Sequence, residues 1–249
     1  SRLLPGIKSP LKNIGPAELD WVIVRENTEG EYSGAGGRVH PKLPQEVGID
    51  VSVFTRDGIE RVMRYAFELA LTRPKKQLTL VTKSNAQRHG MVLWDEVFEK
   101  LKHDYPGITT DRMLVDAITT RMVLQPQSLD TIVATNLHAD ILSDLAAALS
   151  GSLGIGPTAN INPERTFPSM FEPIHGSAFD LVGKDLANPL GAFWSCVMML
   201  EHLQEKKGAS LLMSAIEEVC QEGRHLPKDL GGNSCTGEVT TAVCAALKK

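Results

Sequence analysis

Two carboxylates four residues apart carry the strongest chemical signal in this sequence. Asp140 and Asp144 follow the apolar run Thr131 to Thr135, which predicts a buried strand. The apolar residues around them recur at the spacing of one helix face: Ile141, Leu142, Leu145, Ala146 and Leu149. Both carboxylates should therefore project together from the start of a helix, just past the end of a strand.

This pair of acids has two interpretations. Like charges at i and i+4 repel by roughly a few tenths of a kcal/mol, although acids in a first helical turn regain some of this from the helix dipole. One interpretation is a solvated first turn with Asp140 as the helix cap. The other is a site for Mg²⁺ or Mn²⁺, which take oxygen ligands and would need a further carboxylate. Asp116, at the end of the strand predicted for Asp111 to Val115, is the candidate third ligand.

A lysine and an amide follow the next predicted strand, Gln77 to Thr82. Lys83 and Asn85 are either a simple polar turn or part of a charged pocket in which the lysine acts as a general base. His138 is interpreted as a local hydrogen-bonding residue, because imidazole is not the ligand that Mg²⁺ prefers.

Arg25 and Tyr32 bracket an acidic stretch after the predicted strand Trp21 to Val24. Arg25 is either a surface partner of Glu26 or Glu29, or a fork that holds a substrate carboxylate, which suits the planar guanidinium. Tyr32 is either a packing residue with a satisfied hydroxyl or a catalytic acid.

The segment His175 to Asp180 could be an ordinary turn or a nucleotide-binding loop. Glycines, backbone N–H groups and a nearby acid allow a loop to approach a dinucleotide and bind a ribose diol. The sequence has no GxGxxG motif, so such a site would not be of the Rossmann kind.

Strands and helices alternate along the chain, which predicts an α/β fold. Further helices are expected from Thr55 to Arg73-Pro74, and at Gly90 to His103, Ile118 to Leu124, Pro189 to His202, Ser210 to Glu222 and Gly237 to Leu247. In such sheets ligands bind beyond the carboxyl ends of the strands. The charged side chains expected at those ends are Arg25, Lys83, Asp116 and Asp140.

Two segments lack a helical period. Ser33 to Asp50 is rich in Gly and Pro and is predicted to be an extended excursion or β arm that needs a partner surface. The glycine-rich passage after Ser150 indicates a strand edge or a domain crossing, and a brief strand is expected at Ser169 to Phe171.

Composition excludes several classes of protein. The chain has 249 residues, 42% hydrophobic and 22% charged, which suits one large or two small globular domains. A net charge of -4 does not indicate the excess of positive charge that is typical of proteins that bind nucleic acid. Four cysteines without a CxxC pair favour reduced thiols in the cytoplasm, and neither a membrane span nor a signal peptide is found. The sequence lacks an initiator Met and begins like the middle of a strand, so we expect a segment to precede it.

Five motifs, in this order, resemble the β-decarboxylating dehydrogenases of the isocitrate and isopropylmalate type. They are RENTEGEY (Arg25 to Tyr32), TKSN (Thr82 to Asn85), VDA (Val115 to Ala117), DILSD (Asp140 to Asp144), and EPIHGSAFD (Glu172 to Asp180) with the following ANP. The stretch TKSNAQRHGMVLWDE and the loop FEPIHGSAFD look most like the tartrate and D-malate dehydrogenase branch. The resemblance implies an isocitrate/isopropylmalate dehydrogenase-like fold with mixed sheets layered with helices.

The resemblance also implies roles for individual residues. Asp116, Asp140 and Asp144 would hold Mn²⁺ or Mg²⁺, with K⁺ as a further ion. Lys83 would help to remove the 2-hydroxyl proton, and Tyr32 would protonate the product of decarboxylation. Substrate would be held by Arg25 and Asn85. The NAD site would be lined by Glu172, His175, Gly176, Ser177, Ala178, Asp180 and Asn188.

Homodimers with shared active sites are the expected assembly, because Lys83 and Asp116 of this family reach the site of a second copy. Residues 1–150 would form a smaller substrate, metal and dimerisation domain, with the β arm near residues 33–50 as a clasp. Residues 151–249 would be the C-terminal part of a larger NAD-binding domain whose N-terminal part is absent, because family members carry a further N-terminal third.

The substrate expected from the resemblance is a small 2-hydroxy acid, best D-malate or tartrate. Alternatives are 3-isopropylmalate, isocitrate, or no substrate at all in a non-catalytic subunit. A Mg²⁺-dependent phosphoryl-transfer enzyme would explain the carboxylates but would leave Lys83, Tyr32 and the loop at His175 without a role.

Overall fold

The computed structural model describes residues 1–249 and divides the chain into two compact units. The first, which we call the sheet unit, is Trp21–Ser143. The second, the helical unit, combines Ser1–Asp20 with Asp144–Lys249. Residues 1–150 were expected to form one domain, so the first twenty residues are grouped differently from that expectation.

Long-range contacts explain why the first twenty residues belong to the helical unit. Arg2 Nη2 lies 2.5 Å from Glu217 Oε1, and the Ser9 hydroxyl donates to the Leu149 carbonyl at 2.7 Å. Gly6 has a φ of +82°, and a Cβ there would lie 2.4 Å from the carbonyl oxygen of Cys220. Only glycine can make this approach, because any side chain would collide with backbone.

Eight strands and seven helices make up the chain. The strands are β1 (Val22–Arg25), β2 (Gly30–Val39), β3 (Val47–Val53), β4 (Gln77–Thr82), β5 (Thr109–Leu114), β6 (Thr131–Ala134), β7 (Pro157–Asn160) and β8 (Met170–Pro173). The helices are α1 (Arg56–Thr72), α2 (Gly90–Leu101), α3 (Val115–Leu124), α4 (Asn136–Leu149), α5 (Leu190–His202), α6 (Lys206–Glu222) and α7 (Thr236–Ala246). None of these helices is both long and apolar enough for a membrane span.

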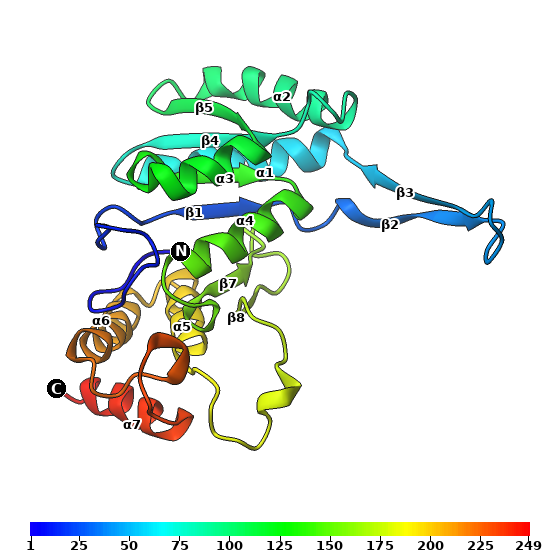
Figure 1. Cartoon of the computed structure of the whole chain (residues 1–249). Coiled ribbons are helices and arrows are strands. Elements are labelled where there is room, and N and C mark those ends of the chain that lie inside the picture. Colours follow the sequence, from blue (N-terminus) through cyan, green and yellow to red (C-terminus); the bar gives the residue numbers. More distant parts are fainter. The chain divides into compact units, whose positions relative to one another are not determined.

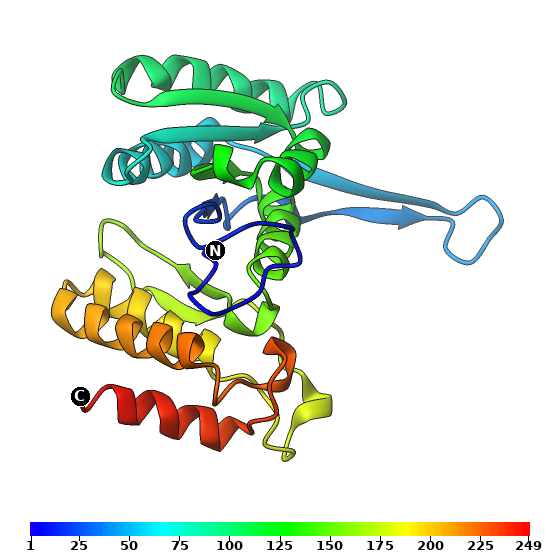
Figure 2. The same ribbon diagram turned by 60° about the vertical axis from the view of Figure 1, so that its left-hand side comes forward.

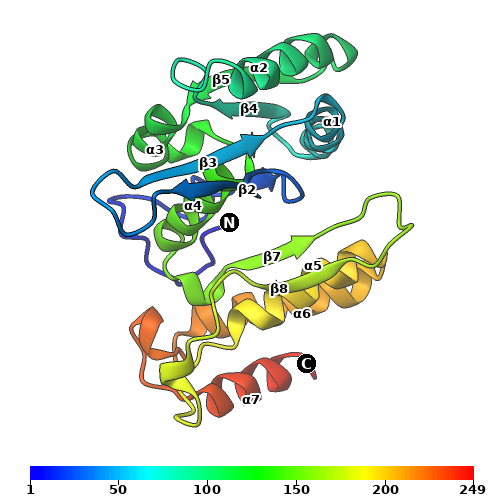
Figure 3. The same cartoon turned by 90° about the vertical axis from the view of Figure 1, so that its right-hand side faces the viewer.

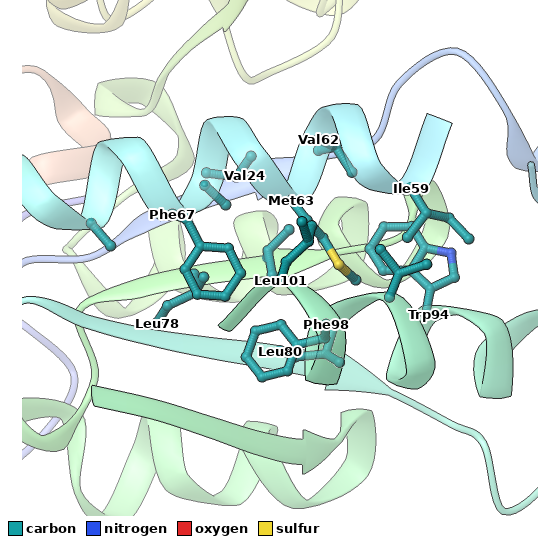
Figure 4. Packing of buried hydrophobic residues seen from close by; sticks show 14 of the residues in the cluster. Val24, Ile59, Val62, Met63, Phe67, Leu78, Leu80, Trp94, Phe98 and Leu101 are labelled. Atoms are coloured by element: carbon teal, nitrogen blue, oxygen red, sulfur yellow. The ribbon is translucent and has the colours of Figure 1, made fainter. Parts of the chain in front are cut away.

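The sheet unit is built on a four-stranded parallel sheet in the order β1-β6-β4-β5, which confirms the predicted α/β fold (Figure 1). Helices α1 and α2 pack together with β4, and α3 lies on the other side of the sheet from α1 (Figure 3). The core between α1, α2 and the sheet includes Met63, Phe67, Trp94 and Phe98 (Figure 4). Phe67 stacks on Phe98, with ring centroids 5.4 Å apart. Large apolar side chains thus fill the space between the sheet and helices α1 and α2.

Local sequence sets both ends of α1. The hydroxyl of Thr55 accepts from the backbone N–H of Gly58 at 3.0 Å, as expected of a helix cap. The helix ends at Thr72 because Arg73 precedes Pro74, which disfavours helical backbone at Arg73.

Strands β2 and β3 form a two-stranded antiparallel hairpin where the sequence predicted an extended arm. The hairpin projects from the sheet unit (Figures 1 and 2). Its apolar side chains on β3, Val47, Ile49, Val51 and Val53, are between 41% and 50% exposed. An isolated hairpin of this kind has little to stabilise it. The partner surface that the sequence predicted for this arm stays a prediction.

The helical unit is organised around packed helices and a small sheet. β7 and β8 pair antiparallel and lie along α5, which packs on α6 (Figure 3). Helix α7, in red, runs beside α6, in orange (Figure 2). All four cysteines of the chain are free thiols, and Cys220 is buried in this unit.

Candidate active site

Parallel pairing brings the predicted charged residues to one edge of the sheet unit. Arg25 is the last residue of β1, and Lys83 directly follows β4. Asp116 lies in the first turn of α3 after β5, and Asp140 lies in the second turn of α4 after β6. Asp116 was expected at a strand end before the helix, but α3 starts at Val115 and includes it. A carboxylate in the first turn of a helix is stabilised by the helix dipole.

Arg25 is the centre of a mixed cluster of cation, carboxylate and phenol. Its Nη1 lies 2.5 Å from Asp140 Oδ1, and its Nε and Nη2 donate to Asn136 Oδ1 at 2.9 and 2.7 Å. The Tyr32 hydroxyl is 3.5 Å from Asp140 Oδ2, and the Arg25 guanidinium carbon lies 5.7 Å from the Tyr32 ring centre. A small anionic molecule could contact the Arg25 cation and the Tyr32 hydroxyl together.

The glutamates beside Arg25 do not pair with it, so the interpretation of Arg25 as their surface partner is wrong. Glu26 is buried and lies 3.6 Å from Arg61 Nη2. Glu29 accepts from the Thr55 backbone N–H at 2.9 Å and from its hydroxyl at 2.7 Å. Both acids are therefore engaged elsewhere, and the Arg25 guanidinium contacts Asn136 and Asp140 instead.

Lys83 and Asp116 form the second charged contact at this edge. The Lys83 ammonium donates to Asp116 Oδ1, and this hydrogen bond lowers the pKa of the Asp116 carboxyl. The Asp116 side chain is 64% exposed and that of Lys83 is 28% exposed. Asn85 is exposed in the turn that follows β4. The pair is thus accessible to a further molecule or a second copy of the chain.

His138 is buried in the first turn of α4. Burial lowers the pKa of its imidazole; the Lys83 charge lowers it further, while Glu31 acts in the opposite direction. Its Nδ1 has no hydrogen-bond partner, so the local hydrogen bond expected of His138 is not made by that atom. Glu31 instead accepts from the Thr135 hydroxyl at 2.8 Å and from the Leu137 backbone N–H at 3.1 Å.

One chain does not assemble the predicted metal ligands into a single cluster. The structure contains no group of three His, Cys, Asp or Glu side chains that could hold a metal ion. Helix α4 carries Asp140 and Asp144 four residues apart, whereas Asp116 is paired with Lys83. Asp140 is not the helix cap, because α4 begins at Asn136. Hard oxygen donors suited to Mn²⁺ or Mg²⁺ are present, but a complete set of three needs a carboxylate from elsewhere.

The predicted nucleotide loop lies in the helical unit. Its exposed members are Glu172, His175, Gly176, Ser177, Ala178 and Asp180. Ala178 adopts a left-handed φ of +43° and begins a short 3₁₀ turn, Phe179–Leu181. Asn188 is less free: its Nδ2 donates to Asp229 Oδ2 at 2.9 Å, and its Oδ1 accepts from the Leu190 backbone N–H at 2.9 Å. Asn188 therefore fixes the start of α5.

A family model described as isocitrate/isopropylmalate dehydrogenase matches residues 3–245 of the chain. The chain belongs to this family. A probable tartrate dehydrogenase/decarboxylase of Agrobacterium vitis is 65% identical over 247 residues, which cover 99% of the chain and 69% of that protein. The decarboxylating D-malate dehydrogenase of Escherichia coli strain K12 is 48% identical, covering 99% of the chain and 69% of its own length.

Solved structures of the isocitrate/isopropylmalate dehydrogenase family share the fold. The crystal structure of isocitrate dehydrogenase from Methylococcus capsulatus matches with a TM-score of 0.90 and 37% identity, covering 99% of the chain and 71% of that structure. These comparisons confirm the family and the resemblance to its tartrate and D-malate dehydrogenases.

Sequence reasoning missed one member of the Arg25 cluster, Asn136. It is buried and accepts two hydrogen bonds from Arg25. The sequence feature that could have identified Asn136 is its position directly after Thr135, at the end of the strand that also precedes Asp140. A neutral amide carries no charge that would mark it as a site residue beside the charged residues of this edge.

Proposed function

We propose that the chain supports NAD-dependent oxidation and decarboxylation of a small 2-hydroxy acid, with D-malate or tartrate as the substrate. The observation that carries the proposal is the cluster of Arg25, Tyr32 and Asp140 at the carboxyl edge of a parallel sheet. The proposal is supported by relatives that are named for tartrate and D-malate decarboxylation.

Each residue of the edge has a role in this chemistry. Arg25 binds a substrate carboxylate, and Lys83 takes the proton of the 2-hydroxyl in the oxidation step, for which NAD would supply the hydride acceptor. The C–C bond to the β-carboxylate then breaks, CO₂ departs with neither of the bonding electrons, and Tyr32 donates a proton to C3. Asp140, Asp144 and an Asp116 from a second copy would hold Mn²⁺ or Mg²⁺, which would supply positive charge at the substrate oxygens.

The remaining roles concern the cofactor and the assembly. The loop from His175 to Asp180 binds the dinucleotide, and an acid at Asp180 favours the free ribose hydroxyl of NAD over the phosphate of NADP. The hairpin β2–β3 joins two copies as a clasp, which brings Lys83 and Asp116 of one copy to the site of the other. The functional unit is then a homodimer with shared sites in the cytoplasm.

The proposal is tested by NADH formation at 340 nm with Mn²⁺, K⁺ and NAD against four acids. We expect turnover of D-malate or tartrate, loss of turnover when the divalent metal is removed, and weaker turnover with NADP. Turnover of 3-isopropylmalate or isocitrate alone would contradict the proposed substrate. No NADH formation with any of the four acids would contradict the proposed activity of this chain.

A further inference from the structure

Asn136 holds the guanidinium of Arg25 from one side. Its side-chain oxygen lies in the fork between Nε and Nη2 of Arg25, at 2.9 and 2.7 Å. Its Nδ2 donates to the Glu29 carbonyl at 3.2 Å. Asn136 is only 4% exposed and is the first residue of α4, so its amide has little freedom to turn away.

The chemistry of this acceptor matters as much as its position. A carboxylate in the same fork would neutralise the guanidinium, whereas an amide oxygen is uncharged. Asn136 thus fixes the orientation of Arg25 without adding a negative charge, and the one carboxylate that pairs with the guanidinium is that of Asp140, whose Oδ1 lies 2.5 Å from Nη1. The donors not engaged by Asn136 are the ones that can bind a ligand carboxylate.

We propose that Asn136 is a positioning residue that orients Arg25 to bind the substrate carboxylate without cancelling its charge. The inference rests on the proposed function, in which Arg25 binds the 2-hydroxy acid. It predicts that Asn136 acts on substrate affinity through Arg25 and has no separate route to the substrate.

Two substitutions separate orientation from charge. Asn136→Ala removes the acceptor, and Asn136→Asp keeps the size but adds a negative charge beside Arg25. We expect KM for the hydroxy acid to rise about tenfold or more in each variant, with a smaller effect on kcat. Asn136→Ala loses hydrogen bonds to a charged group, and the carboxylate of Asn136→Asp competes with the substrate carboxylate for the Arg25 charge. KM for NAD should not change.

A double-mutant cycle distinguishes action through Arg25 from a merely structural role of Asn136. In an Arg25→Ala background, Asn136→Ala should raise KM for the acid no further. Ser128→Ala is the matched control, because the Ser128 hydroxyl accepts from Arg121 Nε at 2.7 Å outside the cluster. That variant should keep the KM of the unsubstituted chain.

Nuclear magnetic resonance of the Arg25 Nε–H, assigned with Arg25→Lys, tests the contact without turnover. We expect slow exchange of this proton with water in the unsubstituted chain and fast exchange in Asn136→Ala. Unchanged exchange, an unchanged KM, or an equal rise in KM without Arg25 would each overturn the inference. Failure of the unsubstituted chain to oxidise any acid would contradict the proposed function, while the exchange rate would still show whether Asn136 holds Arg25.

Discussion

Arg25 and Asp140 form an ion pair with each other, although the proposed function assigns a substrate carboxylate to Arg25 and a metal ion to Asp140. Their side chains are 32% and 41% exposed. Ion pairs with this much exposure contribute about 1 kcal/mol or less, because water screens them. In the proposed function, a substrate carboxylate would therefore replace Asp140 at Arg25 without a large penalty, and Asp140 would then bind the metal.

Asp140→Asn tests the metal role at the scale of one residue. We expect it to abolish Mn²⁺-dependent NADH formation, because an amide is a weaker ligand for a hard cation than a carboxylate. The free energy of unfolding should fall by about 1 kcal/mol or less, since the lost ion pair is partly exposed. Activity assays and urea unfolding measure the two effects.

The matched control is Asp104→Asn, which changes another exposed aspartate that lies 3.5 Å from an arginine, Arg64. It should leave turnover intact. Full Mn²⁺-dependent turnover in Asp140→Asn would show that Asp140 is not a ligand.

At the scale of elements, both ends of helix α1 are determined by residues next to it in the sequence. Thr55 caps its start and Pro74 stops it, so its position could be predicted closely. Helix α6 begins at Lys206, four residues before the expected Ser210, because its first three residues, Lys206 to Gly208, carry no apolar side chain that would mark them as part of the stripe. Periodicity therefore located helices better than it located their ends.

Thr55→Ala tests how far α1 depends on its cap. The Thr55 hydroxyl accepts from the Gly58 N–H and donates to Glu29 Oε2 at 2.7 Å. We expect Thr55→Ala to lower the free energy of unfolding by about 1 kcal/mol. Thr55→Ser keeps the hydroxyl and should retain most of the stability. Urea denaturation gives both values, and an alanine variant as stable as the unsubstituted chain would refute the role of the cap.

At the scale of the whole molecule, the sequence predicted the α/β layering and the charged residues at the strand ends, because both follow from local patterns. The grouping of Ser1–Asp20 with the helical unit was not predicted, since it depends on partners such as Leu149 and Glu217 that are distant in sequence. The pairing of Arg25 with Asn136 and Asp140 also required the structure. Side-chain partners depend on tertiary packing that no periodicity reveals.

Shared sites between two copies can be tested by mixing inactive variants. Lys83→Ala and Tyr32→Phe should each be inactive alone, because each removes one proton-transfer group. If one site takes Tyr32 from one copy and Lys83 from another, mixed dimers regain one intact site. Random reassociation after mild denaturation should then restore about a quarter of the original activity. No recovery, with dimers re-formed by size-exclusion chromatography, would contradict sharing of the site.

The most direct test of the central claim is the amount of CO₂ released for each NADH formed. The chain is supplied with NAD, Mn²⁺ and whichever of D-malate or tartrate it oxidises faster, and both products are measured in the same reaction. Oxidation followed by loss of the β-carboxylate predicts equal molar amounts of CO₂ and NADH. NADH without CO₂ from D-malate, or no NADH from either acid, would contradict the account.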